Sequence, residues 1–159
     1  MHFTNKSLIT ALATTTVFLQ TAANPVAIPD PSPTIEQRSE TSHPCAGDAS
    51  GKTIGVQTCA KVTFKEFHNI AFDLSVTDTK GDSHPVYGWL RVYGPNNYHT
   101  DLPSAKVKNN LGHGHTVTVN GLTWDQGVGK ITGVRAEGCV NDAFSDTCAS
   151  SGFVKNPYA

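Results

Sequence analysis

The sequence predicts an all-β fold, a small disulfide-bonded β-sandwich or partly closed β-barrel of about six to eight strands. Three observations predict it. Apolar and polar residues alternate with period two in several short segments, which is the pattern of half-buried strands. Residues that favour turns, chiefly Gly, Pro, Asn and Asp, separate these segments. No segment repeats apolar residues at the i, i+3, i+4, i+7 spacing of an amphipathic helix over three turns.

The N-terminus has the layout of an export signal. Lys6 precedes a largely apolar run from Leu8 to Leu19, and small residues follow at 21–23. This run is too short to cross roughly 30 Å of hydrocarbon at about 1.5 Å per residue. We therefore expect residues 1–23 to be a cleaved signal peptide and the mature protein to be secreted and extracellular.

The segment after the signal differs in composition from the rest of the chain. Residues 24–43 are rich in Pro and show neither strand nor helix periodicity, so we expect them to be disordered or a propeptide. Cleavage after Arg38 would release the propeptide; otherwise the segment stays attached as a tail. The length of the remainder, residues 44–159, matches a single β domain.

The two longest alternating segments define the first expected strands. Alternation runs from Val62 to Thr77, with a break at 66–69 that indicates either two strands or one bulged strand. Turn-forming residues at 78–82 follow, and alternation resumes over 86–93.

Three further elements are expected in the C-terminal half. Asn120-Gly121 lies between two alternating segments, which predicts a β-hairpin with a two-residue type I′ turn. Residues 130–140 contain another strand pattern, and residues 152–154 would form a short closing strand.

All cysteines of the chain follow the signal: Cys45, Cys59, Cys139 and Cys148. An even number of cysteines in an exported chain predicts disulfides, and the tight Cys-x-x-Cys spacing of zinc sites does not occur. We favour the pairs Cys45–Cys59 and Cys139–Cys148, because each closes a short loop of turn-forming residues. Pairings that tie Cys45 to Cys139 or to Cys148 stay open at this stage.

A candidate binding surface lies in the segment 86–93. Four of its residues, Tyr87, Trp89, Arg91 and Tyr93, are spaced by two and so share one face of the expected strand. Aromatic residues beside Arg are enriched in recognition surfaces. We therefore expect these four residues to bind a protein or a sugar; the alternative is that they pack under a loop or a second sheet.

Three other residue sets suggest different chemistry. A metal site would use the histidines His99, His113 and His115. A calcium site would draw on the aspartates Asp73, Asp78, Asp82 and Asp101. Acid–base catalysis, as in small secreted hydrolases or ribonucleases, would use Glu66, His68 and Arg135.

The layout of the chain resembles small secreted proteins of filamentous fungi: a short signal, a Pro-rich segment ending at Glu36-Gln37-Arg38, and a compact domain with four cysteines. Many such proteins are effectors or elicitors with β-sandwich or β-barrel folds. Residues 61–67 followed by 71–76 also resemble the opening of the fungal allergen and elicitor β-barrel family. The resemblance implies a virulence effector or elicitor that binds a host protein or a cell-wall polysaccharide.

The sequence therefore favours a monomeric, secreted binding protein without a cofactor over an enzyme. Lys and Arg number 12 and Asp and Glu number 13, for a net charge of −1. The chain therefore lacks the excess of basic residues that binding to nucleic acid or an anionic membrane requires. Two alternatives stay open: a small secreted hydrolase or ribonuclease-like enzyme, and an extracellular metal-binding protein.

Overall fold

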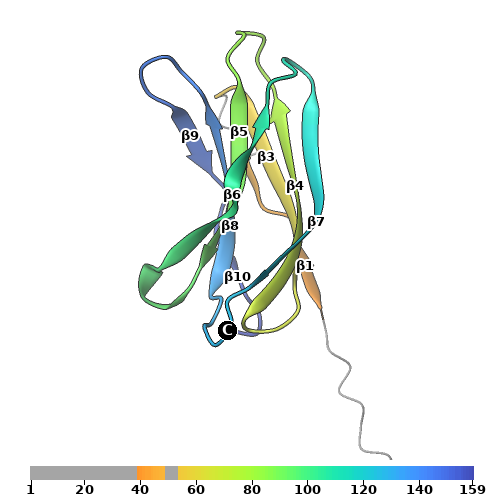
Figure 1. Ribbon diagram of the computed structural model, residues 1–159, viewed down its shortest axis with the longest axis vertical. Helices are drawn as coiled ribbons and strands as arrows, with labels where there is room; N and C mark the ends of the chain where they lie inside the picture. The colour runs from red at the N-terminus through yellow and green to blue at the C-terminus, as the bar shows by residue number, and fades with distance from the viewer. Residues whose placement is uncertain (1–38, 49–53) are drawn as a thin grey trace, which may run out of the picture. The chain divides into compact units, whose positions relative to one another are not determined.

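A computed structural model describes residues 39–48 and 54–159, which form two antiparallel β-sheets packed on each other (Figure 1). Sheet A has the strand order β1-β3-β4-β7, with β2 also paired to β3. Its strands are β1 Glu40–Ser42, β2 Cys45–Gly47, β3 Val56–Phe64, β4 Asn69–Asp78 and β7 Thr116–Asp125. The expected signal peptide and the cleavage after Arg38 lie outside the described residues.

Sheet B has the strand order β10-β8-β5-β6, with β9 also paired to β8. Its strands are β5 Val86–Tyr93, β6 His99–Asn109, β8 Gly133–Val140, β9 Thr147–Ser150 and β10 Val154–Lys155. A short 3-10 helix, Pro95–Asn97, joins β5 to β6, and the described residues contain no α-helix. The all-β prediction is confirmed as a sandwich: the two sheets do not close into a barrel.

The core lies between the two sheets, as the alternation predicts. Each of β3, β4 and β5 buries every second side chain against the other sheet, and β8 adds to the same layer. The largest fully buried side chains are Phe64, Ile70, Leu74, Leu90 and Ile131. The break that the sequence shows at 66–69 is the turn between β3 and β4, so these residues form two strands and not one bulged strand.

The folded domain begins earlier than predicted. The sequence places residues 40–43 in the Pro-rich segment, but the structure pairs β1 with the end of β3. Thr41 lies opposite Thr63, and a 3.1 Å hydrogen bond joins their hydroxyls. A strand of three residues is too short to show a periodicity, and its position is fixed by the ladder of its neighbour. The described domain therefore includes residues before 44.

The prediction of a hairpin at Asn120-Gly121 is wrong. β7 runs through both residues, and they form a β-bulge opposite Asp73, because Phe72 pairs with Leu122 while Leu74 pairs with Val119. A type I′ turn needs positive φ at both central residues. Only Gly121 has it, with φ of 70°, and its N–H donates to the Asp73 carboxylate at 2.8 Å. The bulge uses the same Gly conformation without reversing the chain.

The two disulfides join Cys45 to Cys59 and Cys139 to Cys148, the local pairings that the sequence favours. Each connects residues that lie directly opposite each other in an antiparallel ladder, β2 on β3 and β9 on β8. Both bonds therefore attach a short strand to a longer strand of its own sheet.

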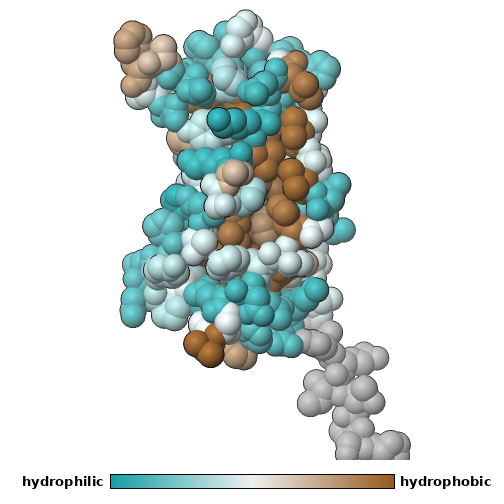
Figure 2. All heavy atoms as spheres, viewed as in Figure 1, coloured by the Kyte–Doolittle hydropathy of each residue, from teal (hydrophilic) through white to brown (hydrophobic). Residues whose placement is uncertain are grey.

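One side of the sandwich is open. β6 and β7 are the edge strands of different sheets, and the core-facing side chains of β7 are only partly buried: Val117, Val119, Leu122 and Trp124. Figure 2 shows apolar side chains gathered along this side of the molecule.

Candidate functional site

The outer face of sheet B carries the residues that the sequence singled out for binding. In β5, Val86, Gly88, Leu90 and Val92 face the core, so the alternate residues Tyr87, Trp89, Arg91 and Tyr93 face away from it. β5 lies between β6 and β8, and both neighbours place aromatic or charged side chains beside these four. We call this surface the aromatic–cationic face; its further members are Lys106, Arg135 and Phe153.

A stacked cluster occupies one end of the face. The rings of Tyr87 and Trp89 are 5.9 Å apart and nearly parallel, at 16°. The Lys106 ammonium lies 3.9 Å from the centre of the Trp89 ring and 5.0 Å from that of Tyr87, a cation–π geometry. Lys106 reaches this position because β6 bulges opposite Trp89: Leu102 pairs with Leu90, but the next pairing is Val107 with Gly88.

Lys106 consequently covers the Trp89 ring, which is not exposed at the surface. Trp89 is only 5% exposed, although its side chain points away from the core. Lys106 is the exposed member of this cluster, and Tyr87 is partly buried. The Tyr87 hydroxyl donates a hydrogen bond to Asp146, and burial together with this carboxylate raises the pKa of Tyr87 to about 12.

An ion-pair network occupies the middle of the face. The Arg91 guanidinium donates two hydrogen bonds to Asp101, at 2.7 and 2.9 Å, and its third nitrogen is 3.8 Å from Glu137. Glu137 is 5% exposed and also accepts a hydrogen bond from the Ser150 hydroxyl. Burial favours the neutral form of Asp101, but the hydrogen bonds and charge of Arg91 outweigh it and hold the pKa of that carboxyl below its ordinary value. Arg91 therefore stabilises the buried carboxylate of Glu137 and the partly buried one of Asp101, and it is not free for a ligand.

A second aromatic and cationic cluster occupies the other end. The Arg135 guanidinium carbon lies 5.9 Å from the ring centres of both Tyr93 and Phe153, and the two rings meet edge to face at 5.5 Å. Phe153 fits there because the β8 residue beneath it is Gly133: a Cβ at that position would lie 2.3 Å from the Phe153 ring. Phe153 remains 45% exposed.

A hollow of about 320 Å³ adjoins the first cluster. Lys106 and Tyr87 form one wall, and the other lining groups on the sheet and its loops are Pro85, Val86, Lys108, Asn110, Asn141 and Asp146. Its lining is therefore largely polar, with two ammonium groups, one carboxylate and two side-chain amides around an aromatic ring.

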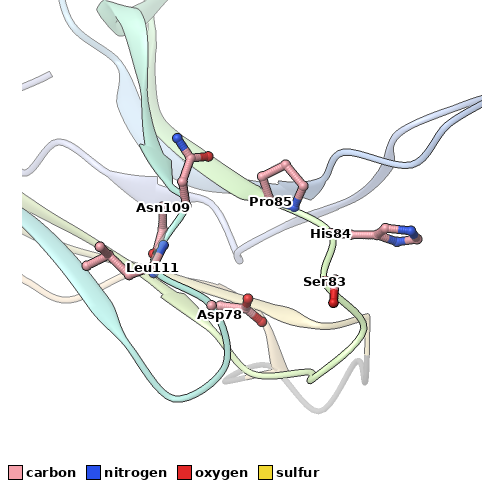
Figure 3. A pocket seen from close by; sticks show the side chains of 8 residues that line it. Asp78, Ser83, His84, Pro85, Asn109 and Leu111 are labelled. Carbon is pink, nitrogen blue, oxygen red and sulfur yellow. Dashed lines mark hydrogen bonds between the residues drawn. The ribbon is translucent and has the colours of Figure 1, made fainter.

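Another hollow, of about 390 Å³, lies where the two sheets meet at the end of the sandwich (Figure 3). The buried residues Asp78 and Asn109 line it, and His84 points away from them. The Asn109 amide donates to two carbonyl oxygens and accepts from the Leu111 N–H, and Asp78 accepts from the Lys80 N–H. These polar groups hold the loops that close the sandwich, so we assign this hollow a structural role.

The structure does not bring the three candidate metal-binding histidines together. His113 and His115 are exposed between β6 and β7, whereas His99 begins the eleven-residue strand β6 at its other end. At about 3.3 Å per residue, these positions are more than about 20 Å apart. In the part of the chain that the structure describes, no three His, Cys, Asp or Glu residues form a group that could hold a metal ion.

The four candidate calcium ligands are scattered as well. Asp101 lies on the outer face of sheet B and Asp73 on that of sheet A, where it holds Gly121. Asp82 pairs with Lys80 at 3.1 Å. Asp78 is buried at the end of β4.

The candidate catalytic residues are only partly assembled. His68 and Glu66 lie together in the turn between β3 and β4, with 3.5 Å between the imidazole Nδ1 and the carboxylate. His68 also packs edge to face on Phe67, with ring centres 4.7 Å apart. Arg135 lies on the other sheet, within the aromatic–cationic face.

Comparison with protein-family models, curated proteins and solved structures finds no match to this chain. The two disulfides are consistent with an extracellular protein. Among residues 39–48 and 54–159, no helix is long and apolar enough to span a membrane.

Sequence reasoning missed the residues that complete the face. Lys106 and Asp101 belong to a segment with little alternation, Glu137 belongs to a strand whose register with β5 the sequence does not reveal, and Phe153 lies just before the two-residue strand β10. The one usable signal is a pair of lysines two residues apart, Lys106 and Lys108, which share a strand face on either side of Val107.

Proposed function

We propose that this protein is a secreted binding protein, a fungal virulence effector or elicitor that contacts a host protein or a cell-wall component through the aromatic–cationic face. The observation that carries the proposal is the regular arrangement of rings and cations on one outer sheet face. Aromatic residues and Arg are the residue types that recognition surfaces favour. The export layout of the sequence and its two disulfides support an extracellular role.

The structure separates supporting residues from contacting residues within this face. Trp89 lies under Lys106, and Arg91 is held by two carboxylates, so these two residues shape the surface. Lys106 and Phe153 are exposed and would touch a ligand first. Variants that test binding should therefore change the exposed pair and leave the supporting pair intact.

The test measures binding of the disulfide-bonded protein to purified cell-wall polysaccharides and extracellular host proteins immobilised on a sensor. We expect at least one probe to bind, and Lys106→Ala with Phe153→Ala to weaken that binding at least tenfold. Phe67→Ala is the matched control, because Phe67 is also 45% exposed but lies in the turn between β3 and β4. Binding that is lost equally in the control, or that survives in the double variant, would remove this face from consideration.

One observation favours a second function, that of a small hydrolase. The Glu66 carboxylate and the His68 imidazole are 3.5 Å apart in a partly exposed turn, an arrangement that acid–base catalysis can use. Hydrolysis of RNA or of a glycan by the wild-type protein, abolished by His68→Ala, would support this function. Equal activity in both proteins would rule out His68.

A further inference from the structure

We propose that the aromatic–cationic face binds an extended acidic polysaccharide, with one uronate-type sugar at each of two subsites. This inference rests on the binding function proposed above and names its ligand class. The first subsite is formed by Tyr87, Lys106 and Lys108 beside the 320 Å³ hollow, and the second by Tyr93, Arg135 and Phe153.

Each subsite holds a cation that forms no ion pair with the part of the protein that the structure describes, although the Asp146 carboxylate, which accepts a hydrogen bond from Tyr87, also lines the first hollow and offsets part of its positive charge. Arg91 pairs with two carboxylates, but among the described residues no carboxylate lies within 4.0 Å of the charged groups of Lys106, Lys108 or Arg135. The Nε of Arg135 is also buried without a hydrogen-bond partner in the described part of the chain. That buried nitrogen is out of reach of a ligand, so a carboxylate would contact the guanidinium of Arg135 through its other two nitrogens.

Each subsite also holds an aromatic wall of the kind that packs against a sugar ring. Tyr87 lines the first hollow, and Tyr93 with Phe153 forms the wall of the second subsite. In the first hollow, the amides of Asn110 and Asn141 provide donors and acceptors for hydroxyl groups. A ring with an apolar face, hydroxyl groups at its edge and one carboxylate matches these three kinds of contact.

The spacing of the subsites calls for a polymer. Tyr87 and Tyr93 are six positions apart on one strand, which at about 3.3 Å per residue places them roughly 20 Å apart. A single sugar cannot reach both positions. Between them, Arg91 offsets one of the two negative charges of Asp101 and Glu137, so the attraction for an anionic chain comes from the subsites at the two ends of the face and not from its centre.

The same features favour a polysaccharide over an acidic protein. The centre of a protein–protein interface is characteristically apolar and well packed. On this face the largest apolar side chain, Trp89, is 5% exposed beneath Lys106, and the adjoining hollow is lined mainly by polar groups.

The experiment compares polygalacturonic acid with its fully methyl-esterified form, which keeps the sugar backbone and removes the charge. Binding is measured by titration calorimetry with the disulfide-bonded protein. We expect the acid to bind at least tenfold more tightly than the ester, and its affinity to fall as salt is raised. Long oligomers should bind at least tenfold more tightly than a trimer, because only the former reach both subsites.

Three variants locate the binding. Lys106→Met keeps the aliphatic stem over the rings and removes the charge, and Arg135→Met does the same at the second subsite. Each should weaken binding of the long acid at least fivefold and reduce the advantage of long oligomers over the trimer. Lys61→Met, an exposed lysine on β3 of the other sheet, is the control and should bind as the wild type does. Denaturant unfolding of each variant checks that it is folded.

The outcomes separate this inference from the function on which it rests. Equal binding of acid and ester, or binding only to an acidic host protein with the same dependence on Lys106, overturns the acidic polysaccharide and leaves the binding function standing. Absence of binding to every polysaccharide and protein probe overturns both. Binding of the acid that Lys106→Met and Arg135→Met leave unchanged overturns the assignment of the two subsites.

Discussion

The two sheets approach each other closely at Gly88 and Gly138, and this contact offers a quantitative test of the packing. The two glycines are paired across β5 and β8, and both face the fully buried Thr58 of β3. A Cβ on Gly88 would lie 2.4 Å from the Thr58 hydroxyl oxygen, 2.6 Å from its methyl carbon and 2.9 Å from a methyl of Val76. Carbon atoms pack best at about 3.5–4.0 Å, so all three contacts are overlaps of roughly 1 Å.

We expect Gly88→Ala to lower the free energy of unfolding by about 3 kcal/mol, the upper part of the usual range for overpacking. In a Thr58→Ala background two of the three overlaps disappear, so the same change should cost about 1 kcal/mol or less. The coupling of about 2 kcal/mol exceeds the roughly 0.5 kcal/mol scatter of independent sites.

The assay is urea unfolding of the four proteins of this cycle under non-reducing conditions. Gly152→Ala is the control: its added Cβ meets no atom within 4 Å, so its effect should stay within about 0.5 kcal/mol. An equal cost of Gly88→Ala in both backgrounds would show that Thr58 does not set the distance between the sheets.

Three further outcomes are expected. Because the pKa of Asp101 is lowered in the folded state, its contribution is present above pH 4 and is lost progressively as the pH falls through the lowered pKa; Asp101→Asn should destabilise the protein by about 1–3 kcal/mol at pH 7 and by progressively less as the pH is lowered below 4 in denaturant titrations. Because the pKa of Tyr87 is raised to about 12, its contribution is present below pH 10 and lost as the pH rises through 12. Tyr87→Phe should accordingly remove the latest phase of tyrosinate absorbance, and Asp146→Asn should shift that phase to lower pH. Replacing Cys139 and Cys148 by Ala should lower the free energy of unfolding by about 3 kcal/mol from loop entropy; a change below 1 kcal/mol would contradict that model.

Much of the fold can be predicted from period-two alternation, because β3, β4 and β5 each have one buried face and one more exposed face. β6 has no such pattern: it contains Pro103, and its pairing with β5 is interrupted by the bulge opposite Trp89. Neither it nor the short strands β1, β2 and β9 was predicted from the sequence. The Asn120-Gly121 pair misled the prediction because Gly121 adopts positive φ in a bulge as readily as in a hairpin turn.

The candidate site was predictable only within a single strand. Alternation places Tyr87, Trp89, Arg91 and Tyr93 on one face, and the structure has them there. The exposure of each residue depends on other strands: Lys106 covers Trp89, and carboxylates from β6 and β8 hold Arg91. Those contacts depend on strand register and on a bulge, which local sequence patterns do not encode.

Neither cystine of this protein connects the two layers of the sandwich. Each one fastens a short flanking strand to its own sheet, so the two layers are held together by side-chain packing and by hydrogen bonds such as those from the Asn109 and Asn156 amides, and not by a disulfide. A reducing agent would then release the short strands β2 and β9 before the two sheets separate. The exposed residues 143–145, enclosed between Cys139 and Cys148, would accept foreign residues with little risk to the core, which makes them a suitable place for an inserted tag.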